Sequence, residues 1–329
     1  MRYNIFHPTD SPTPLLRAVA LLVVCLCLTV SAKAQVVIGG NVYGGGNQGD
    51  VSEHTTVTLQ GGFIEGSVFG GARMANVGGH AFVHVDGAHQ TSNIVVKAVY
   101  GGNDIAGTIG TLGNATLGFS PKVEALNTGT FDKSTFNAFV YTTANETSDK
   151  PYVIGSLYGG GNGAYEYIAA EAGKYTVNVD GMEYTIDDKP ELAKTYIEIG
   201  GGFFGHVFGG GNKVTITENT VIYTENKTPF NGIVNRVCHE HAKIIDLDDR
   251  HYRRVVTEDH KALHEDLIFD HHISGLFGGN NLADMSIRPT WYLKEGRVNN
   301  LYSGGNKGRM THPNGIVLPL RSNDLRVNN

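Results

Sequence analysis

The stretch VYGGGN, residues Val42 to Asn47, opens a pattern that organises the rest of the chain. An aliphatic residue, an aromatic residue and a glycine-rich turn, here called the phrase, recur seven times. The copies begin at residues 42, 68, 99, 157, 207, 276 and 301, at intervals of 26, 31, 58, 50, 69 and 25 residues. We interpret these intervals as one or two units of about 25 to 30 residues, the longest with an insertion, which indicates an internal repeat.

Short runs of alternating apolar and polar residues separate the phrases. The runs TVTLQ at 56–60, FVHV at 82–85, TVNV at 176–179 and YIEI at 196–199 each end at glycine or Asp-Gly. Alternation with a period of two, closed by glycine, predicts strands and turns. The apolar face is expected to carry Val57, Leu59, Val83, Val85, Ile197 and Ile199, and the opposite face Thr58, His84 and Glu198.

A unit of this length cannot bury its own apolar face, whereas stacked units can pair their strands at about 4.8 Å per step. We therefore expect an all-β fold, a right-handed parallel β-helix (β-solenoid) of stacked coils of about 25–30 residues. A left-handed hexapeptide solenoid would show a six-residue period, which the sequence lacks.

The phrase itself suggests three structural devices. Glycine supplies positive φ at corners, and asparagines of neighbouring coils can form amide ladders. The aromatic residues can stack as a ladder, with an ordinary core and a ligand-binding stripe as the alternative interpretations. The residues of this ladder are Tyr43, Phe69, Tyr100, Tyr158 and Phe208.

The composition agrees with a turn-rich β protein. All 44 glycines follow residue 34, and this content excludes a mainly helical fold, because each helical glycine costs about 1 kcal/mol relative to alanine. The 10 prolines and the lack of a three-residue glycine period exclude collagen. A net charge of −6 with 18% charged residues argues against nucleic-acid binding.

Residues 1–34 are typical of a signal peptide. A mixed segment with two arginines precedes the apolar run at 18–30, and Ala32-Lys33-Ala34 offers a cleavage site before Gln35. The apolar run is shorter than the roughly 20 residues of a spanning helix, so the mature chain is expected to have no transmembrane segment. Cleavage removes three basic residues and one acidic residue, which takes the net charge from −6 to −8, and leaves Cys238 without a disulfide partner in the chain.

Two segments interrupt the repeat within the expected solenoid domain, 35–329. Residues 113–150 contain no phrase, and their stretch Thr142–Thr147 is typical of an exposed loop. Residues 213–270 begin as a strand and then become charged, with helical leucine spacing at 259–269. We interpret both segments as loop insertions.

The carboxyl end repeats the start of the last phrase. Arg297-Val298-Asn299-Asn300 precedes the phrase at 301, and Arg326-Val327-Asn328-Asn329 has the same four residues. This repetition predicts that the chain stops inside a coil, either because it is a fragment of a longer protein or because the stack has no terminal cap.

A histidine-rich stretch in the second insertion is one candidate site. Seven of the 14 histidines lie between residues 239 and 272, and thiolate and imidazole are the usual ligands of zinc. A solvated loop is the alternative, because neither a second cysteine nor an H-E-x-x-H motif is present. The candidate ligands are Cys238, His239, His241, His260 and His264.

A group of acids in the same insertion is a second candidate. Asp246, Asp248 and Asp249 lie close in sequence, and paired carboxylates perform glycoside hydrolysis. A charged loop is the alternative, since the motifs of pectin hydrolases are absent. Calcium is a further alternative at 44–50, where Gln48 departs from the G-G-x-G-x-D pattern.

The VYGGGN and VFGGGN phrases, together with the signal-peptide end Ala32-Lys33-Ala34-Gln35, resemble the exported, glycine-rich β-helix proteins of Bacteroidales-type gut bacteria. The resemblance covers most of 35–329. It implies a surface or adhesin-like role, and no catalytic residue carries over from it.

The sequence thus favours a secreted or cell-surface β-solenoid, with the periplasm as an alternative location, that binds or spaces rather than catalyses. The expected partner is a glycan or a host or cell-surface protein along one face, with no nucleic acid. One alternative is a carbohydrate-active β-helix enzyme, a polysaccharide lyase or hydrolase. Another is a metal-binding module at 238–272. No cofactor is expected beyond the zinc or calcium of these alternatives.

Overall fold

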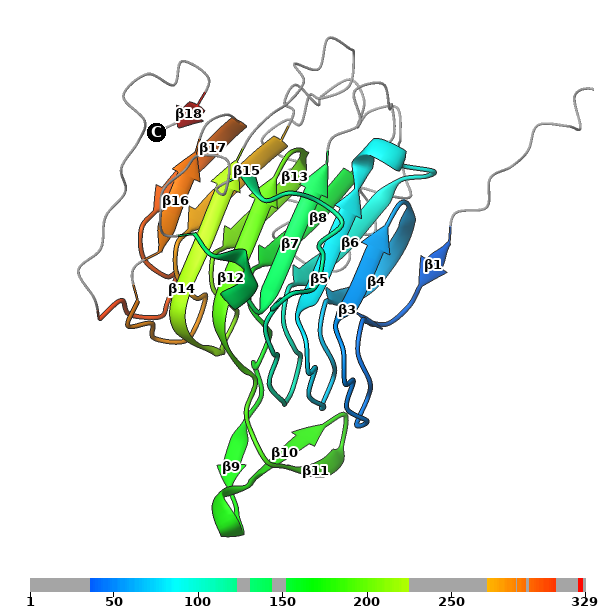
Figure 1. The fold of residues 1–329 in the computed structure, drawn as a ribbon, viewed down its shortest axis with the longest axis vertical. Coiled ribbons are helices and arrows are strands. Elements are labelled where there is room, and N and C mark those ends of the chain that lie inside the picture. Colours follow the sequence, from blue (N-terminus) through cyan, green and yellow to red (C-terminus); the bar gives the residue numbers. More distant parts are fainter. Residues whose placement is uncertain are drawn as a thin grey trace, which may run out of the picture. The chain divides into compact units, whose positions relative to one another are not determined.

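The computed structural model describes residues 36–122, 131–143, 152–224, 271–287, 289–293, 296–311 and 325–327. Within these residues the fold is all-β, which confirms the predicted class (Figure 1). Two of its sheets pair all their strands in parallel, and a third is antiparallel. The short 3-10 helices are η1 (Gly87–His89), η2 (Lys133–Thr135) and η3 (Glu171–Gly173).

The first sheet has nine strands in the described ranges and the second has six. The first sheet consists of β1 (Val37–Ile38), β2 (Val42–Tyr43), β4 (Gly62–Phe69), β6 (Ile94–Tyr100), β8 (Tyr152–Tyr158), β13 (Gly202–Phe208), β15 (His271–Phe277), β17 (Gly296–Tyr302) and β18 (Leu325–Val327). The second consists of β3 (Thr55–Leu59), β5 (Ala81–Asp86), β7 (Ala138–Thr143), β12 (Glu191–Ile199), β14 (Thr215–Thr224) and β16 (Thr290–Leu293).

The chain passes from one sheet to the other with each successive strand. Among the described residues between β3 and β17, this alternation is interrupted only by the antiparallel strands β9 (Tyr167–Ala169), β10 (Tyr175–Val179) and β11 (Met182–Ile186). We call a second-sheet strand and the first-sheet strand that follows it a layer. The phrases lie in register, and their first residues pair in the order Val42, Val68, Val99, Leu157, Val207, Leu276 and Leu301.

Each interval between phrases therefore holds one layer. The interpretation of the intervals of 58 and 50 residues as two units is wrong, because each contains one layer and an insertion. The insertion in the interval of 58 residues precedes β7, and the insertion in the interval of 50 residues, which the sequence analysis did not identify, contains the antiparallel sheet β9–β11.

One apolar core lies between the two parallel sheets and takes alternate side chains from both. The predicted inward set is confirmed, since Val57, Val83 and Ile197 lie in this core together with Val68 and Val99 from the first sheet. On the outer face, Glu198 is nevertheless buried, where it accepts hydrogen bonds from Tyr196 Oη at 2.6 Å and from the Lys122 backbone N–H at 3.1 Å.

A second core covers the outer face of the second sheet. Phe82, Phe139 and Tyr196 pack there against Leu112 and Phe136 of the first insertion. The predicted insertion 113–150 also contains β7, so the expectation of an exposed loop is wrong at Thr142. That residue is fully buried between neighbouring strands, and its Oγ1 donates to the Gly201 carbonyl at 2.9 Å.

In the first six phrases the first glycine is required by close packing of the backbone, and Ser303 takes this place in the seventh. A Cβ at Gly70 would lie 2.6 Å from the carbonyl oxygen of Gly101, and a Cβ at Gly101 would overlap the carbonyl of Gly159 in the same way. Neither glycine has positive φ, whereas Gly62 and Gly202 at the other corner do. The predicted positive φ is correct at that corner and wrong in the phrase, where the close approach of the layers excludes a side chain.

The aromatic residues of the phrases form one continuous ladder. Consecutive rings are 4.5–5.0 Å apart and within 11° of parallel. The stack confirms the predicted ladder and extends it by two residues. Its members are Tyr43, Phe69, Tyr100, Tyr158, Phe208, Phe277 and Tyr302. Five of these rings are buried, so the stack is a packing element of the fold.

A row of polar side chains follows the phrases, and we call it the turn row. From layer to layer, the Nδ2 group of each asparagine donates to the preceding side chain at 2.9 Å, and the last acceptor is the buried carboxylate of Asp104. Beyond Asp104, Arg73 donates to Asn47 at 2.9 Å. The turn row consists of Asn47, Arg73, Asp104, Asn162, Asn212, Asn281 and Asn306.

The turn row confirms an amide ladder, but two asparagines of the phrases stand outside it. Asn103 and Asn280 occupy the place of the third glycine and are buried. Their side chains bind backbone instead: Asn103 accepts from the Ala72 N–H at 2.7 Å, and Asn280 accepts from the Gly211 N–H at 2.8 Å. The ladder position in these two phrases is the next residue, Asp104 or Asn281.

Candidate functional site

Both predicted sites lie in segment 225–270, outside the described residues. The residues concerned are Cys238, His239, His241, Asp246, Asp248, Asp249, His260 and His264. Within the described ranges, no three His, Cys, Asp or Glu side chains are grouped to hold a metal ion. The same ranges contain no helix long and apolar enough to cross a membrane.

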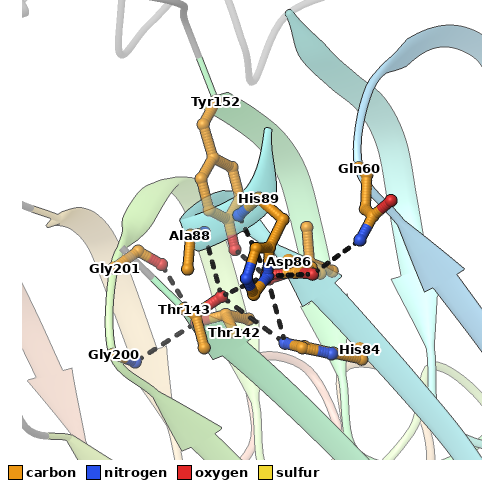
Figure 2. Close-up of polar contacts among 11 residues, drawn as sticks. Gln60, His84, Asp86, Ala88, His89, Thr142, Thr143, Tyr152, Gly200 and Gly201 are labelled. Atoms are coloured by element: carbon orange, nitrogen blue, oxygen red, sulfur yellow. Dashed lines mark hydrogen bonds and ion pairs between the residues drawn. The ribbon is translucent and has the colours of Figure 1, made fainter. Parts of the chain in front are cut away.

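A buried carboxylate, Asp86 at the end of β5, is the centre of a polar cluster (Figure 2). It accepts hydrogen bonds from Nε2 of Gln60 at 2.9 Å and from Oγ1 of Thr143 at 3.2 Å. The backbone N–H of His89 donates to it at 3.2 Å, and Nδ1 of the same residue lies 2.9 Å from Oδ2. Nε2 of His84 lies 3.8 Å from Oδ1.

Opposing effects set the charge of this cluster. Burial raises the pKa of Asp86, but hydrogen bonds from Gln60 and His89 and the nearby His84 outweigh burial and leave the pKa below its usual value. Burial lowers the pKa of His84. At neutral pH the cluster therefore holds a carboxylate anion beside a neutral imidazole.

The cluster ties three layers together. Gln60 follows β3, Asp86 ends β5 and Thr143 ends β7, and the Asp86 side chain also caps η1. His89, whose side chain is 76% exposed, is held in one orientation toward solvent by this carboxylate. An oriented imidazole is one part of a general base. The contacts of Asp86 join the ends of β3, β5 and β7 and cap η1, so we assign the cluster a structural role.

A cleft of about 400 Å³ lies where the antiparallel sheet meets the turns of the repeat. One wall consists of three successive turns, through Gln48 and Asp50, Met74–Asn76, and Ala106 with Gly107. The other wall is Tyr184–Asp188, at the end of β11. Figure 1 shows β9, β10 and β11 beside the turn ends of the layers.

Hydrogen bonds between layers fix the polar side chains of the first wall. Oδ1 of Asp50 accepts from the backbone N–H of Asn76 at 2.8 Å. The side-chain oxygen of Asn76 in turn accepts from the N–H and Oγ1 of Thr108, at 2.9 and 3.1 Å. A carboxylate, an amide and a hydroxyl thus stand in one column, one layer apart.

The second wall is anchored to the same turns by packing and by hydrogen bonds. Val177 and Ile186 of the antiparallel sheet share a core with Ile105. Tyr167 Oη donates to the carbonyl of Ile105 at 2.7 Å, and the N–H of Gly107 donates to the carbonyl of Asp188 at 3.3 Å. The cleft is therefore formed by rigid elements on both sides.

The antiparallel sheet is also attached to the turn row, at the two members that are not asparagine. Tyr165 Oη donates to Oδ1 of Asp104 at 2.9 Å, and Tyr43 Oη donates to Oδ2 at 2.7 Å. Burial raises the pKa of Asp104, and these hydrogen bonds, with one from Asn162, lower it by less. The guanidinium of Arg73 lies 5.8 Å from the centre of the Tyr184 ring.

Sequence reasoning missed this cleft. Asp50 was part of the calcium alternative, but Asp187 and Asp188 carried no pattern. The run at 176–179 was predicted as a strand of the repeat, whereas it lies in β10 of the antiparallel sheet. The one signal was the interval of 50 residues between two phrases, which contains the insertion.

Comparison with known proteins gives no match, whether to a family model, a curated protein or a solved structure.

Proposed function

We propose that this chain is a β-solenoid that is exported through the general secretory route and lies outside the cell or on its surface. There it binds a partner without catalysis. The observation that carries the proposal is the register of seven phrases, joined by one ladder of rings 4.5–5.0 Å apart. Such a stack is a rigid scaffold whose turns and insertions form an extended surface.

The alternation of strands between two parallel sheets supports right-handed coils in which each layer is one turn. Export rests on the signal-peptide pattern of residues 1–34 and on the resemblance to exported glycine-rich β-helix proteins. A binding role rests on the cleft, whose walls belong to fixed elements. The partner is a glycan or a protein of a cell surface.

The test uses the full chain, expressed with its leader and recovered after export. Amino-terminal sequencing is expected to begin at Gln35. The recovered protein is applied to an array of neutral, amino and acidic oligosaccharides and to a panel of purified cell-surface proteins. We expect binding to members of one set, with the bound molecule unchanged by mass spectrometry. Cleavage of a bound oligosaccharide, or no binding to either set, would overturn the proposal.

A further inference from the structure

We infer that the cleft between the repeat turns and β11 binds a neutral glycan through the hydroxyl groups of one or two sugar rings. This inference rests on the proposed binding function and names its site and ligand class. It depends on the polar groups of the two walls, on their charge and on their rigidity.

The two walls face each other with hydrogen-bonding groups of complementary kinds. The first wall offers the Asp50 carboxylate, the Gln48 amide and the Nδ2 group of Asn76, which makes only a long contact of 3.4 Å with Asp50 Oδ2. The second wall offers the carboxylates of Asp187 and Asp188. Carboxylates accept two hydrogen bonds from neighbouring hydroxyls, and amides both donate and accept. A ligand with several adjacent hydroxyl groups can satisfy both walls at once.

The spacing of the first wall suits a ligand with a repeating outline. Asp50 and Asn76 occupy equivalent places in adjacent layers, and Thr108 continues the column. Groups in such a column are about 4.8 Å apart, the distance between neighbouring strands. Tyr184, which is only partly buried, lines the cleft beside these polar groups, and an aromatic side chain suits the C–H face of a sugar ring.

The charge of the cleft selects against anions. Among the described residues that line it are three carboxylates and neither lysine nor arginine. Two cations lie beside the lining residues: Lys174 pairs with Asp187 at 2.8 Å, and the Arg73 guanidinium lies 5.8 Å from the centre of the Tyr184 ring, so the three carboxylates are only partly balanced. Acidic polysaccharides and phosphates would therefore meet repulsion. A cationic peptide would fit the charge, but hydrogen bonding by Gln48 and Asn76 favours a hydroxyl-rich ligand.

The experiment compares two charge-matched double variants of the exported full chain. Asp187→Asn with Asp188→Asn removes two carboxylates from the cleft. Asp180→Asn with Glu183→Gln also removes two exposed carboxylates. These lie at the turn between β10 and β11 and at the start of β11, outside the cleft. All four residues are exposed, so circular dichroism and thermal melting are expected to be unchanged in both variants.

Binding is measured by calorimetry with the tightest oligosaccharide from the array. We expect this oligosaccharide to be neutral. The cleft variant is expected to bind it at least about tenfold more weakly than the native chain, and the control variant is expected to differ from the native chain by less than about twofold. If the cleft variant binds like the native chain, the cleft assignment is wrong while the binding function stands. If acidic oligosaccharides bind best, or if only a cationic peptide binds through Asp187 and Asp188, the assignment of a neutral glycan is wrong. Failure to bind anything contradicts the proposed function itself.

Discussion

The two ends of the turn row differ in composition and in what surrounds them. From Asn162 to Asn306 the row is uniform, and each amide donates to the one before it. Towards the amino terminus the pattern breaks, with Asp104 and Arg73 in place of asparagine. The insertion that contains the antiparallel sheet contacts the row at these two residues, through Tyr165 before β9 and Tyr184 in β11. Uniform positions therefore build the stack, and departures from uniformity mark where an insertion docks and a cleft forms.

The largest effect is expected in the uniform region, from Gly159→Ala. The new Cβ would overlap the carbonyl of Gly209 in the next layer, and neither backbone can move without disturbing the ladder. We expect a loss of about 3 kcal/mol or more in the free energy of unfolding, measured by denaturant titration. Gly49→Ala, in a turn of the other region with open space around it, is the control and is expected to change stability by less than about 0.5 kcal/mol. Equal stabilities of the two variants would show that the layers do not approach as described.

A pH-dependent effect is expected at His80, which precedes β5 in the place that Asn137 takes before β7. His80 is 2% exposed, and its Nδ1 has no hydrogen-bond partner in the part of the chain that the structure describes. Burial, followed by the charge of His54, lowers its pKa to about 4. Asn137 at the equivalent place donates to the carbonyls of Ile109 and Gly110, both at 2.9 Å.

Between pH 6.5 and 4 the unfolded chain protonates this histidine and the folded chain does not, so stability falls as the pH falls. By pH 4 this difference is expected to lower the free energy of unfolding by about 3 kcal/mol relative to pH 7. His80→Asn is expected to remove this part of the acid sensitivity, whatever its effect at pH 7. Unfolding free energies of both proteins at pH 7 and at pH 4 measure the difference. An unchanged acid sensitivity in the variant would contradict the burial of a neutral imidazole at this position.

The smallest effect is expected at the break in the turn row itself. The raised pKa of Asp104 means that the fold favours the neutral side chain. Asp104→Asn is therefore expected to stabilise the chain at pH 7 by about 1 kcal/mol or less. Asn212→Asp, its reverse in the uniform region, is expected to destabilise by a similar amount, because a carboxylate would face the Asn162 side-chain oxygen. Thermal melting of the two variants compares them directly, and a loss of stability in Asp104→Asn would show that the anion is the favoured form.

Most of the fold was predictable because the phrase is repeated, and each copy can align with its neighbours in one way only. Val42 and Leu301 lie in one column with five residues between them, as their common phrase indicates. The reason for the glycines was not predictable, since the contact between Gly70 and Gly101 exists only after stacking. The same holds for Thr142, whose polar, loop-like neighbourhood hid a strand position that is filled by a hydrogen bond to the next layer.

The cleft was less accessible to sequence reasoning than the fold. Asp50 and Asp188 are far apart in the chain, and only the return of β11 toward the earlier turns brings them to one site. A pattern search finds residues that recur at regular spacing, whereas the cleft is made by residues that do not recur. The interval lengths hold the information that an insertion exists, but not where it packs.

The glycine contacts between layers have a consequence for how this chain can change in evolution. The first glycines of the phrases, from Gly44 to Gly209, each face the first glycine of the next layer, so a side chain cannot be added there without a compensating change in the neighbouring layer. Gain or loss of an entire layer disturbs nothing of the kind, because every new interface repeats an old one. Lineages carrying this architecture are therefore expected to vary in length by whole layers, while their phrase glycines stay fixed.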